Sequence, residues 1–190
     1  MATQLDTGTD ELLCSVDDRV ATITLNRPER KNALSDNLTP ALRQTLLELN
    51  TAQEVGCIVI TGAGNAFCAG GDVSGMGGGS NDEKPAHTPS MQDRVKILQH
   101  KQETLTLRLF EHAKPTIASL PGPAVGAGMC IALACDIRIG SESAFIGTGY
   151  RNVGFSGDYG GSWLLTQLVG IAKAKELFFT GRRIQSDECL

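Results

Sequence analysis

The sequence predicts an α/β fold, because segments with strand character alternate along the chain with segments of helical periodicity. The run from 55 to 61 is almost wholly apolar, which is typical of a parallel strand buried on both faces. The stretch from about 36 to 51 repeats leucine at helical spacing. Many of the 22 glycines cluster just beyond predicted strands, where open α/β sheets bind their ligands.

The first half of the chain divides into a hairpin, a helix and a strand. Apolar and polar residues alternate over 12–16 and 20–25, on either side of a short charged turn, which predicts a β-hairpin. Ser35 has a suitable side chain for the N-cap of the helix that runs from about 36 to 51. After the buried strand, the Gly-, Ser-, Asn- and Pro-rich residues 73–90 predict a mobile loop.

The second half repeats the alternation with shorter elements. A helix is expected from about 91 to 112, with Val95, Leu98, Leu105 and Leu109 on one face. The expected elements that follow it are a strand at 116–120, an apolar helix at 126–134, and strands at 136–140 and 144–147.

The C-terminal region is predicted to be helical and incomplete. Two helices, 159–169 and 171–180, should be separated by Gly170. The last ten residues, 181–190, look like the start of another helix that stops without a cap. We therefore expect a truncated chain whose C-terminal helical part is missing.

Composition narrows the class of protein. Hydrophobic residues make up 41% and charged residues 20%, which is ordinary for one globular domain over residues 1–190. The acidic, polar start is no secretory signal, and no apolar run could span a membrane, so a cytoplasmic protein is expected. A net charge of −4 argues against nucleic-acid binding. The six cysteines form no Cys-x-x-Cys pair and the histidines are scattered, so we expect free thiols and no metal site.

Two glycine-bearing segments carry the clearest chemical signal. Residues 67–73 follow the strand at 55–61, and residues 121–130 follow the strand at 116–120. The second segment also opens a helix, whose first amides have no partner within the helix and favour negative charge. Two such amides could converge on one oxygen and stabilise an enolate. The alternative is that these glycines only form tight turns.

Several motifs together resemble the crotonase (enoyl-CoA hydratase/isomerase) superfamily, and the resemblance runs from about residue 12 to residue 190. They are Asn-Arg-Pro…Asn-Ala-Leu at 26–34, Phe-Cys-Ala-Gly-Gly-Asp at 67–72, Pro-Gly-Pro-Ala-Val-Gly-Ala-Gly at 121–128 followed by Cys-Asp, Ser-Gly-Asp-Tyr-Gly-Gly-Ser at 156–162, and Leu-Val-Gly at 168–170. The resemblance implies a spiral of ββα units and a homotrimer or hexamer. It also implies that the trimerisation helices are missing from this chain.

The same resemblance implies roles for particular residues. The amides of Gly71 and Ala127 would form an oxyanion hole for the thioester carbonyl of an acyl-CoA. Coenzyme A would enter as part of the substrate, with no prosthetic group. The residues implied along its path are Arg27, Lys31, Ala33, Ala69, Gly70 and Asp72, with Arg30 a further candidate for its phosphates. The alternative for the basic residues is a solvated loop.

The chain departs from the superfamily's hydratase pattern at both glutamates. Cys130 stands at one glutamate position, and the other falls near Gly149 or Tyr150. Asp158 remains, at a position where phenylacetate-pathway epoxide isomerases and a haloaryl-CoA dehalogenase place an aspartate. It is our candidate catalytic base, and the alternative is that it caps the following helix. Cys130 is interpreted as a small buried residue rather than a nucleophile.

These features favour an enzyme that moves a proton or a double bond in an acyl-CoA through an enolate. Isomerase chemistry is preferred, because two carboxylates are the simpler way to handle water. The alternatives are a divergent enoyl-CoA hydratase, or a non-catalytic protein of the same fold that binds CoA or RNA.

Overall fold

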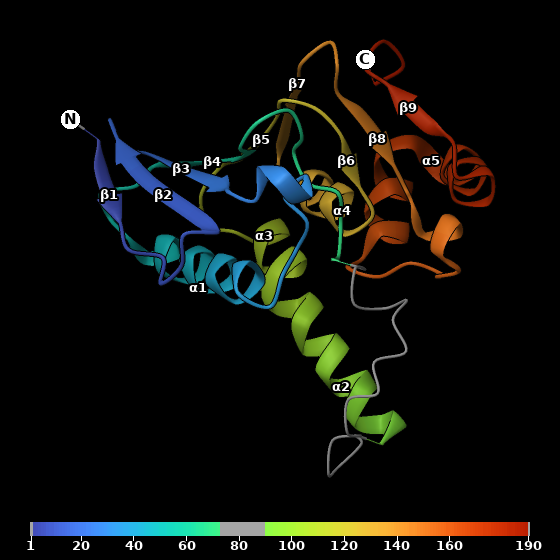
Figure 1. The fold of residues 1–190 in the computed structure, drawn as a ribbon, viewed down its shortest axis with the longest axis horizontal. Helices are drawn as coiled ribbons and strands as arrows, with labels where there is room; N and C mark the ends of the chain where they lie inside the picture. Colours follow the sequence, from blue (N-terminus) through green and yellow to red (C-terminus); the bar gives the residue numbers. More distant parts are fainter. Residues whose placement is uncertain (1, 73–89, 190) are drawn as a thin grey trace.

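A large sheet forms one side of the molecule (Figure 1). The structure is a computed structural model that describes residues 2–72 and 90–189. The sheet has the order β1-β2-β3-β4-β5-β7. Its strands are β1 (Thr3–Leu5), β2 (Leu12–Asp17), β3 (Val20–Leu25), β4 (Cys57–Gly62), β5 (Thr116–Leu120) and β7 (Ile137–Gly140). The first three are antiparallel neighbours, and each pairing from β3 to β7 is parallel.

The large sheet confirms the predicted hairpin and the predicted parallel strand. Strand β4 is the apolar run, and Ile58 and Ile60 on it are fully buried. Strand β1 was not predicted, because three residues are too few to show a periodicity. The loop predicted at 73–90 lies outside the described residues except for Ser90.

A second, smaller sheet has the order β6-β8-β9, formed by β6 (Ala124–Val125), β8 (Phe145–Gly147) and β9 (Arg183–Gln185). The prediction of a helix within the last ten residues is wrong. Residues 183–185 instead pair antiparallel with β8, and a turn follows. Two contacts hold the strand there, because Ile184 is buried and the Arg183 guanidinium lies 4.6 Å from the centroid of the Phe145 ring.

Helix α1 (Leu38–Thr51) packs against the large sheet (Figure 1). Its buried leucines are Leu38, Leu42, Leu46 and Leu49, as the spacing predicted. The helix begins two residues later than expected. The Ser35 hydroxyl still accepts a hydrogen bond from the Leu38 amide at 2.9 Å, so it satisfies a first-turn donor as predicted.

The helical segment after residue 90 is only half packed. It comprises α2 (Met91–Gln102), a π-helical turn η2 (Glu103–Leu107) and α3 (Arg108–Phe110). Leu105 and Leu109 are buried as predicted, but Val95 and Leu98 are exposed by 57% and 43%. The predicted face is therefore wrong for α2, which projects away from the two sheets (Figure 1). The π-turn also shifts the register between the two halves of the segment.

The remaining helices lie close to the second sheet (Figure 1). Helix α4 (Ala127–Ala134) is buried along its whole length, and α5 (Gly161–Thr180) packs against it. Gly170 interrupts α5 with φ 77° and ψ 165°, which confirms the predicted break. Short 3-10 turns occupy η1 (Pro28–Arg30) and η3 (Tyr150–Val153). No helix within 2–72 or 90–189 combines the length and the apolar character needed to cross a membrane.

Candidate active site

The two glycine-bearing loops are joined to each other by backbone hydrogen bonds. The Val125 amide donates to the Cys68 carbonyl at 2.9 Å, and Cys68 and Ala124 form an isolated parallel bridge. Farther along the first loop, Gly71 forms a second such bridge with Leu34. The loops follow different strands of the large sheet, β4 and β5, and these contacts join them to each other.

Glycine is required where the two loops come closest. A β-carbon on Gly128, in the first turn of α4, would lie only 2.3 Å from the Cys68 carbonyl oxygen. Gly70 has φ +97°, and a β-carbon there would lie 2.9 Å from the Val125 carbonyl oxygen and 3.5 Å from the Ala127 amide nitrogen. The Ala127 amide therefore lies beside the backbone of Gly70, one residue from the Gly71 amide.

Both loops open into a cavity of about 500 Å³. Gly71 and Ala127 line it, and Asp158 lines it from the segment that precedes α5. Ala127 is the first residue of α4, so its amide has no acceptor within the helix. The site thus brings together the three residues predicted to be catalytic, together with Ala69, Gly70 and Asp72 from the predicted CoA path.

Asp158 is held by a tyrosine and does not cap the helix. The Tyr150 hydroxyl donates to the Asp158 Oδ1 atom at 2.8 Å. Helix α5 has Gly160 as its N-cap residue, without a side-chain cap hydrogen bond, so the capping alternative finds no support. Burial raises the pKa of the Asp158 carboxyl, and the hydrogen bond from Tyr150 opposes part of that rise.

Tyr150 also contacts Cys130, which the resemblance to the superfamily places at one hydratase glutamate position. The Cys130 Sγ atom lies 3.1 Å from the Tyr150 hydroxyl oxygen. Cys130 is fully buried, and burial raises the pKa of its thiol to about 12. A thiol with that pKa stays protonated at neutral pH, which agrees with its interpretation as a small buried residue rather than a nucleophile.

Three of the predicted CoA-path residues lie outside the cavity lining, namely Arg27, Lys31 and Ala33. Arg27 is 13% exposed, and its guanidinium donates to the Ala33 carbonyl at 2.7 Å and to the Asp72 carboxylate at 3.1 Å. It also lies 3.5 Å from the Glu11 carboxylate. The charge of Arg27 is therefore already engaged with two carboxylates, and a part in binding phosphate finds no support in this geometry. Lys31 is exposed, and its Nζ atom donates to the Asn65 side chain at 2.9 Å.

Sequence reasoning missed two cations and one phenol in the cavity. Arg43 and Lys101 line it from α1 and α2. The Arg43 guanidinium lies 3.4 Å from the Tyr159 hydroxyl oxygen and donates to the Lys101 carbonyl at 3.3 Å. The sequence marks Tyr150 only as lying near a position where hydratases carry a glutamate. No motif marks these side chains, because the cavity is formed by segments that are distant in sequence.

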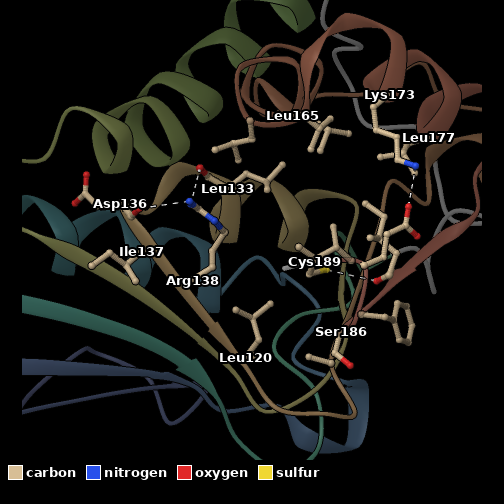
Figure 2. A pocket seen from close by; sticks show the side chains of 18 residues that line it. Leu120, Leu133, Asp136, Ile137, Arg138, Leu165, Lys173, Leu177, Ser186 and Cys189 are labelled. Atoms are coloured by element: carbon tan, nitrogen blue, oxygen red, sulfur yellow. Dashed lines mark hydrogen bonds and ion pairs between the residues drawn. The ribbon is translucent and has the colours of Figure 1, made fainter.

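A second cavity, of about 550 Å³, lies between α5 and strands β7, β8 and β9. Figure 2 shows leucines around it, among them Leu120 from β5, Leu133 from α4 and Leu165 from α5. At its edge Lys173 and Glu188 form an ion pair of 2.8 Å (Figure 2). None of the residues predicted to be functional lines this cavity. Within the described parts of the chain, no three His, Cys, Asp or Glu side chains are grouped so that they could hold a metal ion.

Comparison with known proteins defines the class to which this fold and site belong. A family model described as enoyl-CoA hydratase/isomerase matches residues 15–190. The chain therefore belongs to the enoyl-CoA hydratase/isomerase family, within the crotonase superfamily, and its two-sheet architecture is the crotonase-type spiral.

Individual relatives differ in the reaction that their names describe. One similar protein is the 1,2-epoxyphenylacetyl-CoA isomerase of Escherichia coli K12, which is 33% identical over 177 residues, covering 93% of this chain and 65% of that protein. Another, from Mycobacterium tuberculosis, is assigned as enoyl-CoA hydratase EchA14 and is 36% identical over 171 residues, covering 89% of this chain and 62% of that protein. The present chain thus spans less than two thirds of the length of both.

Solved structures of similar proteins have the same fold as this chain. A Thermobifida fusca protein assigned as an enoyl-CoA hydratase, solved in complex with CoA, superimposes with a TM-score of 0.81 at 35% identity. The match covers 94% of this chain and 68% of that one. The enoyl-CoA hydratase of Bacillus anthracis gives a TM-score of 0.77 at 32% identity, covering 95% of this chain and 66% of that one.

Proposed function

We propose that residues 1–190 form an acyl-CoA-binding domain that isomerises an enoyl-CoA thioester, with Asp158 as the single catalytic base. One observation carries the proposal: Asp158 lines the same cavity as the adjoining loops that contain Gly71 and Ala127. Families with this fold include both hydratases and isomerases, so the residues within the cavity decide between them.

The two amides would supply the oxyanion hole. When a proton leaves the carbon next to a thioester, negative charge develops on the carbonyl oxygen. Preorganised backbone donors stabilise that charge, and the loss of one such donor typically costs about 3–4 kcal/mol. Gly71 suits this role, because its bridge to Leu34 uses the Gly70 carbonyl and the Asp72 amide and does not use the Gly71 amide.

Asp158 would move the proton. Its carboxylate takes a proton from the carbon next to the thioester, and the electron pair of that C–H bond passes to the carbonyl oxygen as an enolate. The protonated Asp158 then returns the same proton two carbons farther along, and the double bond shifts. A carboxyl with a raised pKa suits both halves of the transfer.

The other acidic groups at the cavity are less suited to a second catalytic role. Among the described residues that line it, the acidic ones are Asp36, Asp72 and Asp158. Asp72 pairs with Arg27 at 3.1 Å, and Asp36 is exposed next to the start of α1. With Cys130 and Tyr150 at or near the hydratase glutamate positions, a single carboxylate that moves one proton is favoured over the addition of water.

Several further parts of the proposal rest on resemblance. The CoA complex of the Thermobifida fusca relative supports an acyl-CoA substrate, with CoA bound as part of it. That the enzyme uses no prosthetic group is a further part of the proposal. We also propose a homotrimer or hexamer, acting in the cytoplasm on acyl-CoA, with trimerisation helices that lie outside these residues. A divergent hydratase and a non-catalytic CoA- or RNA-binding protein are the alternatives.

Absorbance assays with two substrates distinguish these possibilities. Wild-type protein is mixed either with a 3-enoyl-CoA or with crotonyl-CoA, and the absorbance of the conjugated thioester is followed. An isomerase raises the absorbance with the 3-enoyl-CoA and leaves crotonyl-CoA largely unchanged. Loss of absorbance with crotonyl-CoA would identify a hydratase. No change with either substrate, together with measurable binding of CoA, would favour the non-catalytic alternative.

A further inference from the structure

Tyr150 lies at the centre of a hydrogen-bonded group of three side chains. Its hydroxyl oxygen is 2.8 Å from the Asp158 Oδ1 atom on one side and 3.1 Å from the Cys130 Sγ atom on the other. The side chains found at or near both hydratase glutamate positions therefore converge on the one aspartate that remains. The proposed function gives no role to this arrangement.

The phenol ring is held rigidly. Tyr150 is only 6% exposed, and its ring stacks on Phe178 with a centroid separation of 6.2 Å and an interplanar angle of 4°. Gly161 approaches the other side of the group, because a β-carbon there would lie 2.7 Å from the Cys130 Sγ atom and 3.8 Å from the Tyr150 hydroxyl oxygen. The direction of the hydroxyl group is therefore set by packing from η3, α4 and α5.

The Tyr150 hydroxyl is the donor to the ionised Asp158 carboxylate. Burial raises the pKa of Tyr150, so the phenol stays protonated through the neutral range. A phenol that donates to a carboxylate favours the ionised form and fixes the orientation of the oxygens. Among the described residues, the hydrogen bond to the Asp158 carboxylate goes to Oδ1, which leaves Oδ2 as the oxygen available for proton exchange.

We propose that Tyr150 is a positioning residue, which orients the Asp158 carboxylate through the hydrogen bond to Oδ1 so that the other oxygen exchanges the proton with substrate. This inference rests on the proposed function, because it gives Asp158 the part of the base. Tyr150 itself need not touch the reacting carbons. Tyr150 orients the Asp158 carboxylate and favours its ionised form.

Other titratable or charged groups also surround Asp158 and must be separated from Tyr150 in a test. Cys130 approaches from α4, and its Sγ atom lies 3.6 Å from the Asp158 carbonyl oxygen. Tyr159 is the adjacent residue, and Arg43 and Lys101 line the cavity from α1 and α2. The chain has only two tyrosines, so Tyr159 is a matched control. It lines the same cavity, but its hydroxyl group contacts Arg43 and makes no hydrogen bond to the Asp158 carboxylate.

The experiment measures the ionisation of Asp158 directly. Protein labelled with ¹³C in the aspartate carboxyl groups is titrated by NMR, and the Asp158→Asn spectrum identifies the Asp158 signal. Tyr150→Phe removes one donor to the carboxylate, so the midpoint should move to higher pH, whereas Tyr159→Phe should leave it in place. With a 3-enoyl-CoA, the acidic limb of kcat/KM should move in the same direction, with a loss in kcat of up to about 10²-fold from misplacement of the base.

A second substitution should shift the Asp158 titration midpoint in the opposite direction, and it replaces Tyr150→Phe as the test if that variant does not fold. Replacing Tyr150 with 3,5-difluorotyrosine makes the phenol a stronger donor, which should move the Asp158 midpoint to lower pH. An unmoved midpoint in a folded Tyr150 variant would overturn the inference, as would an equal shift in Tyr159→Phe. A wild-type protein inert toward every acyl-CoA would instead overturn the proposed function, whatever the titration shows.

Discussion

Gly128 tests whether the close contact between the two loops is needed for activity. It lies in the first turn of α4, and a β-carbon there would lie 2.3 Å from the Cys68 carbonyl oxygen and 2.6 Å from the Cys68 β-carbon. Ordinary contacts begin near 3.4 Å, so Gly128→Ala must push the helix and the first loop apart by about 1 Å. Neither obstacle is the end of a flexible side chain, so the backbone itself has to move.

The expected magnitude follows from that displacement. Overpacking a buried contact typically costs about 1–3 kcal/mol, and each kcal/mol lowers the Tm of a domain of this size by about 2–4 °C. Ala127 is the neighbouring residue, so its amide should move with the helix. A misplacement of about 1 Å can cost about 10²-fold in rate. Gly128→Ala should therefore cost about 10²-fold in isomerase turnover even at temperatures where the protein is still folded.

The assay compares Gly128→Ala with a matched glycine substitution nearby. Gly147 lies in β8, and its carbonyl accepts a hydrogen bond from the Gly126 amide, but a β-carbon there would meet no atom nearer than 3.8 Å. Gly147→Ala should keep the wild-type Tm and turnover of a 3-enoyl-CoA. If Gly128→Ala also kept wild-type turnover at a temperature where it is folded, the proposed contribution of the two-loop contact to catalysis would be refuted.

Three further predictions concern ionisation, ion pairing and thiol reactivity. Burial raises the pKa of the Asp158 carboxyl, so ionisation of this group lowers the stability of the fold as the pH rises above the unfolded pKa of about 3.9. In thermal melts, Asp158→Asn should be at least as stable as wild type at pH 7, and the difference should shrink toward low pH. A clear loss of Tm at pH 7 would contradict this. Arg27→Met should lower the free energy of unfolding by about 2–3 kcal/mol, because it removes a hydrogen-bond donor from half-buried partners. Arg30 is exposed, so the control Arg30→Met should change the free energy of unfolding by less than about 0.5 kcal/mol. Similar denaturant midpoints for the two variants would count against a structural role for Arg27. In the folded protein only Cys57 and Cys189 should react quickly with a thiol reagent, because the other four thiols are buried; rapid reaction of more than two thiols would disprove the packing described.

Much of the fold could be predicted because local patterns and tertiary packing agree. The run of β4 is apolar on both faces, and the leucines of α1 repeat at the spacing of one buried helical face. Gly170 also breaks α5 where its position suggested. In each case the residue type demands the same environment that the fold provides.

Predictions failed where tertiary context decides the structure. The apolar residues of α2 have helical spacing, but the helix projects away from the sheets, so Val95 and Leu98 stay exposed. Residues 183–185 become a strand because β8 offers an unpaired edge, which no local pattern reveals. The same limit applies to the site. Arg27 has the charge of a phosphate ligand, yet the fold places Asp72 and Glu11 beside it.

The site itself was predicted in part. Glycine placement after two strands pointed to the two loops, and close backbone approach at Gly70 and Gly128 is the physical reason for that signature. The choice of Gly71 and Ala127 within the loops came from the resemblance to the crotonase superfamily. Tyr150 was missed as a partner of Asp158, since a hydrogen bond between side chains eight positions apart in an irregular segment leaves no such signature. Contacts between side chains from separate segments leave no pattern in the sequence.

The most direct test of the account is the turnover of a 3-enoyl-CoA by Asp158→Asn. The asparagine keeps the shape and can still accept the hydrogen bond from Tyr150, but it cannot take a proton. If Asp158 is the base, kcat should fall by about 10²–10⁴-fold, while the affinity for acyl-CoA and the Tm are retained. Turnover at the wild-type rate by the folded Asp158→Asn protein would contradict the central claim.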